Sequence, residues 1–131
     1  MIALRIVTPK GNYASLNVKS IHIKSVEGEM TILSNHIPSF ASIVPCELVL
    51  ECEDGNKNEY ALSGGFFHFE NNEALLLTDA IEGKGEIDLE RAKKAYERAR
   101  KRLEKKDSNT DMKRAELALQ RAIIRIHVSE N

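Results

Sequence analysis

The chain has 131 residues, of which 42% are hydrophobic and 30% charged, enough for one domain or for a small domain with an appendage. A full doubly wound nucleotide-binding fold or a (β/α)-barrel is not expected at this length. No apolar run approaches the roughly 20 residues needed to cross a bilayer, and the N-terminus Met1–Arg5 lacks the basic start and long apolar stretch of a secretory signal. We therefore expect membrane association only through a partner.

The formal net charge of -1 conceals an asymmetry between the two ends of the chain. Residues 1–85 contain 6 Lys/Arg and 11 Asp/Glu, whereas residues 86–131 contain 13 and 9. An acidic front and a basic tail indicate two parts with different partners. The overall charge argues against a general nucleic-acid binder, although the tail alone would attract polyanions.

The first 80 residues predict a series of short strands. The clearest is Cys46–Cys52, which has apolar residues at its even positions and two glutamates at its three odd ones, as a half-buried strand does. Asp54–Asn56 predicts a turn, and Tyr60 and Leu62 continue the alternation on the return strand. Six extended residues span roughly 20 Å, so Cys46 and Cys52 are too far apart for a disulfide and we expect two free thiols.

Other turns follow from the same pattern. Asn71-Asn72 separates residues 67–70 from residues 73–77, and Asn tolerates the positive φ of a two-residue hairpin. The apolar parity changes between residues 16–18 and 21–23, which predicts a bulge or bend near Lys19-Ser20. Gly64-Gly65 does not precede a helix, so a turn or bulge is favoured over a phosphate loop. Strands at this spacing indicate an antiparallel sandwich or barrel.

The last third of the chain predicts two helices. Residues 88–106 contain no Gly, Pro or β-branched residue, and Asp88 is a suitable N-cap. Residues 107–110 form a polar break, where Asn109 or Thr110 is expected to cap the second helix. Each helix has an apolar stripe at three- and four-residue steps: Ala92, Ala95, Tyr96, Ala99 and Leu103, then Ala115, Ala118, Leu119, Ala122, Ile123 and Ile126. A short loop between them predicts an antiparallel hairpin, marginally stable alone because alanines bury little area, and so a candidate moving part.

No catalytic motif occurs in the chain. A Gly-x-Ser-x-Gly elbow, a His-Glu-x-x-His pair and a Gly-x-x-x-x-Gly-Lys-Ser/Thr loop are all missing from the sequence. The four histidines, at positions 22, 36, 68 and 127, are scattered, and no Cys-x-x-Cys spacing suggests zinc, so we expect neither an enzyme nor a metal site. His36 precedes Pro38 in a loop, as a turn residue or a partner contact.

Four arginines are candidates for anion binding. Arg91 and Arg98 share one face of the first helix, and Arg121 and Arg125 share one face of the second. Antiparallel packing would let the four guanidiniums converge, and guanidinium groups match phosphate oxygens. Asp88 and Ile87 would then be placed to meet a base. Solvated helix faces, or docking of the basic run 98–106 on an acidic protein surface, explain the same spacing.

Several segments in order resemble the epsilon subunit of bacterial rotary ATP synthase. They are Gly28–Met30, Asn35–Pro38, Ser63–Phe66, Leu77–Ala80, Glu86–Asp88, Arg91-Ala92 and the alanine-rich ending Ala115–Val128. The resemblance covers the whole chain. It implies an α+β fold in two parts, with an N-terminal antiparallel β-sandwich in residues 1–84 followed by an antiparallel two-helix hairpin in residues 85–131.

The resemblance also implies a role. The sandwich would bind the gamma subunit and the membrane ring of c subunits, with Glu29 and His36 facing the c-ring, and would couple catalysis to proton or sodium flow. The hairpin would permit ATP hydrolysis when folded down and inhibit it when extended into the catalytic alpha and beta subunits. The protein would be a non-catalytic, peripheral subunit at the cytoplasmic face of the bacterial cell membrane.

Some members of that family bind ATP as a regulatory ligand through an Ile/Leu-Asp-x-x-Arg-Ala motif. The motif is complete here as residues 87–92. The resemblance therefore implies ATP-binding residues at Glu82, Ile87, Asp88, Arg91, Ala92, Arg98, Arg121 and Arg125.

Two other functional hypotheses remain open. The protein would be a purely structural coupler if the arginines are solvated and the hairpin never senses nucleotide. An unrelated sandwich module for sugars would need a surface aromatic cluster, yet the chain has no Trp and only 5% aromatic residues.

Overall fold

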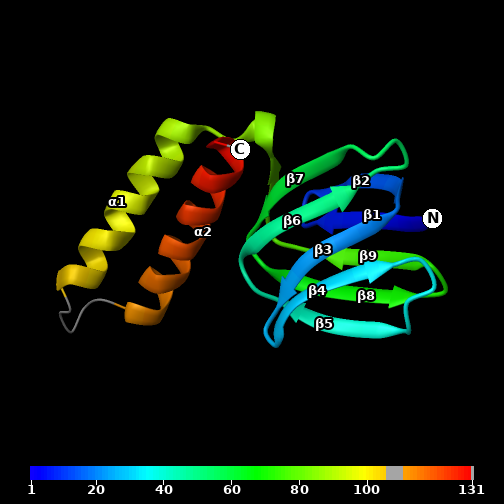
Figure 1. Ribbon diagram of the computed structural model, residues 1–131. Helices are drawn as coiled ribbons and strands as arrows, with labels where there is room; N and C mark the ends of the chain where they lie inside the picture. Colours follow the sequence, from blue (N-terminus) through cyan, green and yellow to red (C-terminus); the bar gives the residue numbers. More distant parts are fainter. Residues whose placement is uncertain (106–110, 131) are drawn as a thin grey trace.

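The computed structural model describes residues 1–105 and 111–130 and shows a strand-rich part followed by two helices (Figure 1). The helical elements are the single 3-10 turn η1 (Lys84–Glu86), α1 (Leu89–Lys105) and α2 (Met112–Glu130). The strands are β1 (Ile2–Thr8), β2 (Gly11–Val18), β3 (Ser20–Ser25), β4 (Gly28–Leu33), β5 (Ser39–Ile43), β6 (Cys46–Glu51), β7 (Lys57–Leu62), β8 (Gly65–Glu70), β9 (Glu73–Leu77) and β10 (Ile81–Gly83).

The strands form a sandwich of two layers. They pair in the order β10-β7-β6-β3-β5-β8-β9-β1-β2, with β4 also paired to β3. β3 and β5 share only the pair Ser25–Ile43, so the sheet folds over at this point into layers β4-β3-β6-β7-β10 and β5-β8-β9-β1-β2. The predicted antiparallel sandwich is confirmed, with one difference: β1 and β9 run parallel. Sequence periodicity does not distinguish the two pairings for such short strands.

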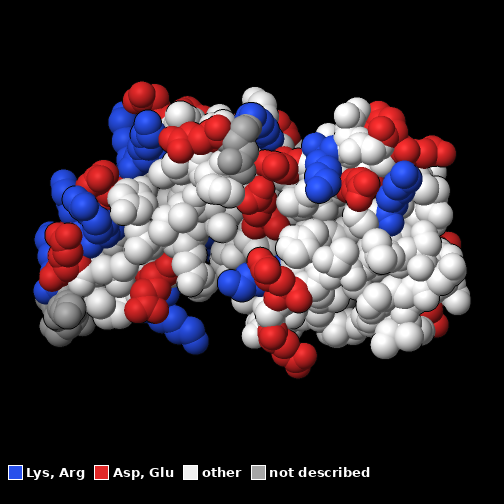
Figure 2. Space-filling model, in the orientation of Figure 1, with Lys and Arg blue, Asp and Glu red and all other residues white. Residues whose placement is uncertain are grey.

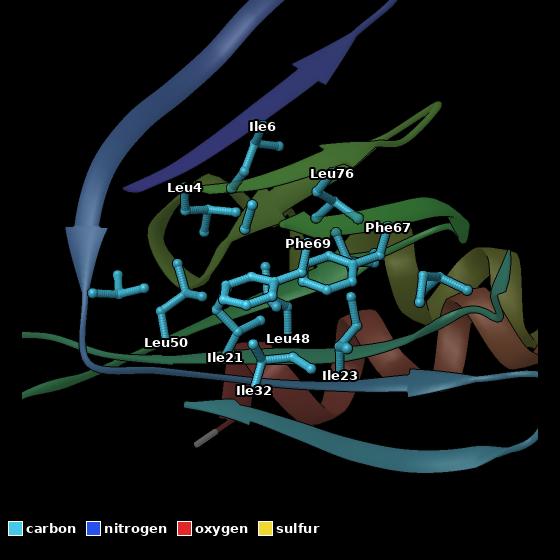
Figure 3. Close-up of a cluster of buried hydrophobic side chains, with 14 of the residues drawn as sticks. Leu4, Ile6, Ile21, Ile23, Ile32, Leu48, Leu50, Phe67, Phe69 and Leu76 are labelled. Carbon is cyan, nitrogen blue, oxygen red and sulfur yellow. The ribbon is translucent and has the colours of Figure 1, made fainter. Parts of the chain in front are cut away.

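The core lies between these layers (Figure 3). Alternate residues of β1, β3, β6 and β8 are buried, as the period-2 pattern of residues 46–50 predicts. Phe67 and Phe69 of β8 are fully buried, and each contributes roughly 1.5–3 kcal/mol of hydrophobic stabilisation. Cys46 is buried and Cys52 half-buried, both as free thiols, and burial raises the pKa of the Cys46 thiol. Every residue of this core cluster lies between positions 2 and 81.

The turns predicted at residues 54–56 and at Asn71-Asn72 are confirmed, whereas Gly64-Gly65 is an irregular connection that leads into β8 and not a turn or bulge. Asn71 and Asn72 have φ of 51° and 59°, the left-handed backbone of a two-residue hairpin. Gly65 has φ of 142°, and a Cβ there would lie 1.9 Å from the Leu77 carbonyl oxygen. The change of parity near Lys19 is a bend between β2 and β3, whereas the register shift lies between Ile6 and Val7 in β1.

The two helices form an antiparallel hairpin in which α2 lies between α1 and the sandwich (Figure 1). The interface between the helices uses the predicted alanine stripes, and four of their alanines are buried: Ala92, Ala99, Ala115 and Ala122. Small side chains let the helix axes approach closely but remove little apolar area from water.

Each helix is capped by an aspartate, and the prediction is right for one of the two. The predicted cap of α1 is confirmed, because Asp88 Oδ1 accepts the Arg91 N–H at 3.1 Å. The second helix is capped by Asp111, whose Oδ1 accepts the Arg114 N–H at 3.0 Å. The predicted caps, Asn109 and Thr110, lie outside the described residues. Because α2 begins at Met112, directly after Asp111, the prediction that one of them caps it was wrong.

Ile123 was also wrongly placed in the buried stripe of α2. Its side chain is 45% exposed, whereas Val128 is fully buried. α2 contacts β6 and β7 as well as α1, so it needs a second apolar side that includes Val128. The sequence pattern predicts one apolar stripe on α2 and does not indicate this second side. Neither described helix combines the length and apolar character that a bilayer crossing requires.

Candidate functional site

The junction between α2 and the sandwich contains a guanidinium paired with a carboxylate. Arg125 Nε lies 2.6 Å from Glu82 Oε1, and Nη2 donates to Oε2 at 3.3 Å. The two side chains are only 23% and 31% exposed, so solvent screens this pair less than a surface pair. The buried Nε–H is not directed at an acceptor within hydrogen-bond geometry, which leaves donor capacity in the guanidinium.

A cavity of about 240 Å³ lies beside this ion pair. It is lined by Arg121, Arg125 and Glu82 from the predicted set, together with Ala61, Leu62, Ser63 and Ala80. Typical small-molecule pockets measure roughly 300–1,000 Å³, so this cavity has room for part of a nucleotide. The structure thus brings three of the eight predicted ATP-binding residues together.

The motif residues lie at the start of α1, outside that cavity. Asp88 caps the helix through its carboxylate, Ala92 is buried in the helix interface, and Ile87 is half-buried between η1 and α1. A carboxylate has about four acceptor positions, so Asp88 can accept further hydrogen bonds while it caps α1.

The remaining two arginines are exposed on α1. Arg98 borders a shallow surface depression with Glu90, Lys93, Lys94 and Glu97. The cavity beside Arg121 and Arg125 includes neither Arg91 nor Arg98. The convergence of all four guanidiniums is therefore not present in this conformation.

Helix geometry nevertheless puts three of the arginines on one side of the hairpin. Arg91, Arg98 and Arg121 each directly precede a buried alanine at position 92, 99 or 122. One residue corresponds to 100° of helical rotation, and in antiparallel helices facing each other through those alanines the preceding residues point to the same side. None of the ion pairs among the described residues involves these three arginines.

A hydrogen bond also connects the hairpin to the sandwich. His127 Nδ1 of α2 lies 2.8 Å from Glu47 Oε2 of β6. No sequence pattern links residues 80 positions apart, so this contact was not predicted. Within residues 1–105 and 111–130, no group of three His, Cys, Asp or Glu side chains is arranged to hold a metal ion.

Glu29 and His36 lie near the two ends of β4. Glu29 is exposed near the start of β4, 3.9 Å from His22 Nε2. His36 follows the other end of β4 and packs edge-on against Phe69, with ring centroids 5.9 Å apart. Residues 29–33 are extended and span roughly 13 Å. The chain then turns, and the His36 N–H donates to the Leu33 carbonyl oxygen at 3.1 Å, so the two residues lie near opposite ends of β4.

The outer face of the second layer has an exposed apolar cluster, which we call the apolar face: Phe40, Phe66 and Leu77. Phe40 is 70% exposed, Phe66 51% and Leu77 43%, and the two phenyl rings stack with centroids 6.0 Å apart. Much of the sandwich surface in Figure 2 has no charged side chain. The low aromatic content of the chain gave no reason to expect the stacked pair of Phe40 and Phe66. The alternation of β8 does indicate one member, because burial of Phe67 and Phe69 requires Phe66 to point outward.

These features define a two-part protein: a β-sandwich with an exposed apolar face, followed by a basic helical hairpin. Two family models match, the ATP synthase delta/epsilon chain β-sandwich domain over residues 1–84 and the long α-helix domain of the same chain over residues 86–130. The chain therefore belongs to the family of ATP synthase epsilon chains.

Individual relatives agree with this assignment. The ATP synthase epsilon chain of Ligilactobacillus salivarius is 35% identical, covering 100% of this chain and 96% of that one. That of Clostridium novyi is 40% identical, covering 95% of each. A chain from the Euglena gracilis mitochondrial ATP synthase, solved with OSCP, F1 and the c-ring, superposes with a TM-score of 0.81 at 30% identity, over 91% of this chain and 75% of that one.

Proposed function

We propose that this protein couples the gamma subunit to the c-ring in the central stalk of ATP synthase and restrains ATP hydrolysis through its hairpin. The membership of an epsilon chain family supports the coupling role, and the weakly attached hairpin supports the restraint. The protein would reach the cytoplasmic face of the bacterial membrane through the complex.

The apolar face is our candidate for the contact with gamma. Exposed aromatic side chains in a cluster are typical of interaction surfaces. The β3–β4 turn, where Val26 is 67% exposed beside Glu29, and the loop of His36 are the candidate contacts with the c-ring. Phe40→Ala should weaken gamma binding by about 2 kcal/mol, as loss of a central aromatic anchor does. Leu33→Ala on β4 of the other layer, where Leu33 is 57% exposed, is the control, and equal affinities would remove the apolar face from the gamma interface.

The contacts between α2 and the sandwich that the described residues show are suited to release, because the polar ones are partly exposed. Contacts of α2 with the sandwich include the pairs Arg125–Glu82 and His127–Glu47 and the buried Val128. Such pairs contribute about 1 kcal/mol or less when partly exposed. In the extended state, the basic helices would meet acidic segments of the catalytic alpha and beta subunits.

ATP would favour the folded-down state if it binds there more tightly than to the extended one. The observation that supports this most directly is the row of Arg91, Arg98 and Arg121 on one side of the hairpin, which have no carboxylate partner among the described residues. The end of the hairpin at which α1 begins contains Ile87, Asp88 and Ala92, and Glu82 precedes them. The carboxylates of Glu82 and Asp88 could accept hydrogen bonds from the base there. Arg125 would exchange part of its contact with Glu82 for a phosphate oxygen.

Thermal unfolding of the full chain against ATP tests the sensor. A ligand at 100 times its dissociation constant adds roughly 2.7 kcal/mol to the state it binds. We expect stabilisation by ATP, less by GTP, and none for Arg91→Ala. The absence of any shift at millimolar ATP would leave the purely structural coupler as the function.

Titrating single variants separates the sensor from solvated arginines. Arg98→Ala and Arg121→Ala should each weaken ATP binding at least tenfold, as the loss of a charge-assisted hydrogen bond does. Lys101→Ala and Lys113→Ala remove exposed cations from the same helices and should change little. Equal losses in all four variants would indicate general electrostatic attraction without a defined site.

A further inference from the structure

The two layers of the sandwich meet at a seam where no backbone ladder joins the described strands. β2 and β10 stand at the two ends of the strand order. Tyr13 of β2 crosses the seam: its hydroxyl donates a hydrogen bond to Glu86 Oε1 of η1. Its ring also packs edge-on against Tyr60 of β7, with centroids 6.4 Å apart and an interplanar angle of 85°.

The Glu86 carboxylate also holds the linker between sandwich and hairpin in a turn. Glu86 Oε1 accepts the Gly83 N–H at 2.9 Å, which folds residues 83–86 into the 3-10 turn. Gly83 permits this approach, because a Cβ there would lie 3.1 Å from Glu86 Oε1 and 3.6 Å from the Tyr60 ring. Ile87 and the helix cap Asp88 follow directly, so the position of Glu86 sets the point at which α1 begins.

The electrostatics keep both partners in their hydrogen-bonding forms at neutral pH. Burial, and next the bond to Glu86, raises the pKa of Tyr13, so the phenol stays protonated as a donor. The bond from Tyr13, followed by that from Gly83, lowers the pKa of Glu86, so the carboxylate stays an acceptor.

We propose that Tyr13, Tyr60 and Glu86 form a latch that fixes the linker at residues 83–87 and holds the hairpin in the folded-down state. The latch joins an edge strand near the N-terminus to the chain segment that connects sandwich and hairpin. Extension of α1 away from the sandwich requires the linker to leave its turn, and Glu86 then loses Tyr13 and Gly83 together. This inference rests on the proposed release of the hairpin.

Hydrogen exchange of the linker amides in the full chain tests the latch directly. Tyr13→Phe keeps the ring and removes the donor, and Glu86→Gln keeps the size and removes the charge. Each should increase the exchange rate at residues 83–87 by about tenfold, the effect of losing a hydrogen bond to a charged acceptor. Tyr96→Phe removes the hydroxyl of a half-buried residue of α1 and should leave these amides unchanged. Linker exchange in Tyr13→Phe and Glu86→Gln that matches the wild type would overturn the latch.

Two further measurements separate failure of the latch from failure of the proposed function. Tyr13→Phe should weaken ATP binding several-fold and increase inhibition of ATP hydrolysis in the assembled F1 complex, because the folded-down state is less populated. If the wild type neither binds ATP nor inhibits, the brake is refuted and exchange alone decides whether the linker is fixed. If the wild type does both and Tyr13→Phe behaves identically, the latch is refuted and the brake stands.

Discussion

Gly65 occupies a position that no other residue fits without displacing backbone. Its φ of 142° and the 1.9 Å that would separate a Cβ from the Leu77 carbonyl oxygen are two independent obstacles. Gly11 has φ of 118° and open space around it. Replacing it by Ala therefore measures the cost of the positive φ without a steric clash. We expect Gly65→Ala to lower the free energy of unfolding by about 4 kcal/mol and Gly11→Ala by about 1–2 kcal/mol. Denaturant titration measures both, and equal losses would contradict the role of the close approach.

Tyr13 and Glu86 make stability depend on pH at both ends of the range. A raised pKa, as that of Tyr13 is, stabilises the fold fully below the unfolded value of about 10, and this is lost as pH rises further. The lowered pKa of Glu86 stabilises the fold above about pH 4.5, and this is lost as pH falls. Between about pH 9 and 12, unfolding of Tyr13→Phe should therefore depend less on pH than that of the wild type or Tyr96→Phe. Parallel profiles would exclude this origin of alkaline instability.

At the scale of elements, α2 differs from α1 because it is covered on two sides. Val128 is fully buried whereas Ile123 is 45% exposed, although both are apolar residues of one helix. Val128→Ala should weaken hairpin docking by about 2 kcal/mol, and Ile123→Ala should change it by less than about 0.5 kcal/mol. Hydrogen exchange in α2 reports the difference. Similar exchange in the two variants would mean that the side of α2 facing the sandwich does not hold the hairpin.

At the scale of the whole molecule, the core belongs to one part. All members of the core cluster lie between positions 2 and 81, and the hairpin adds mainly alanines. Residues 1–84 alone should therefore fold cooperatively, with a melting temperature within a few degrees of the full chain, whereas residues 85–131 alone should be largely unfolded in circular dichroism. Failure of residues 1–84 to fold would show that the hairpin is part of the cooperative unit.

Much of this architecture follows from local patterns. Three features can be recognised in the sequence because each depends on the backbone preferences of a few neighbouring residues. They are the alternation in residues 46–52, the Asn71-Asn72 turn and the absence of helix breakers after Asp88. The start of α2 after Asp111 is the exception, because Asn, Thr and Asp all cap helices and only the chain path selects one of them.

The site was less predictable than the fold. The positions of Glu82, Arg121 and Arg125 around one cavity required the sandwich and α2 to be packed together, and the separation of Glu29 from His36 required the direction of β4. Contacts such as His127–Glu47 and Tyr13–Glu86 join residues 80 and 73 positions apart, and no local propensity encodes them.

The amino-acid sequence by itself determined the two-part organisation, the class of each part and the family motifs, because these depend on periodicity, charge and short-range backbone preference. Only the tertiary structure decided the parallel pairing of β1 with β9, the two-sided burial of α2, the exposed aromatic pair and the seam closed by Tyr13. Each of these depends on which surfaces meet when distant segments bury their apolar area together, and that free energy is a property of the packed molecule.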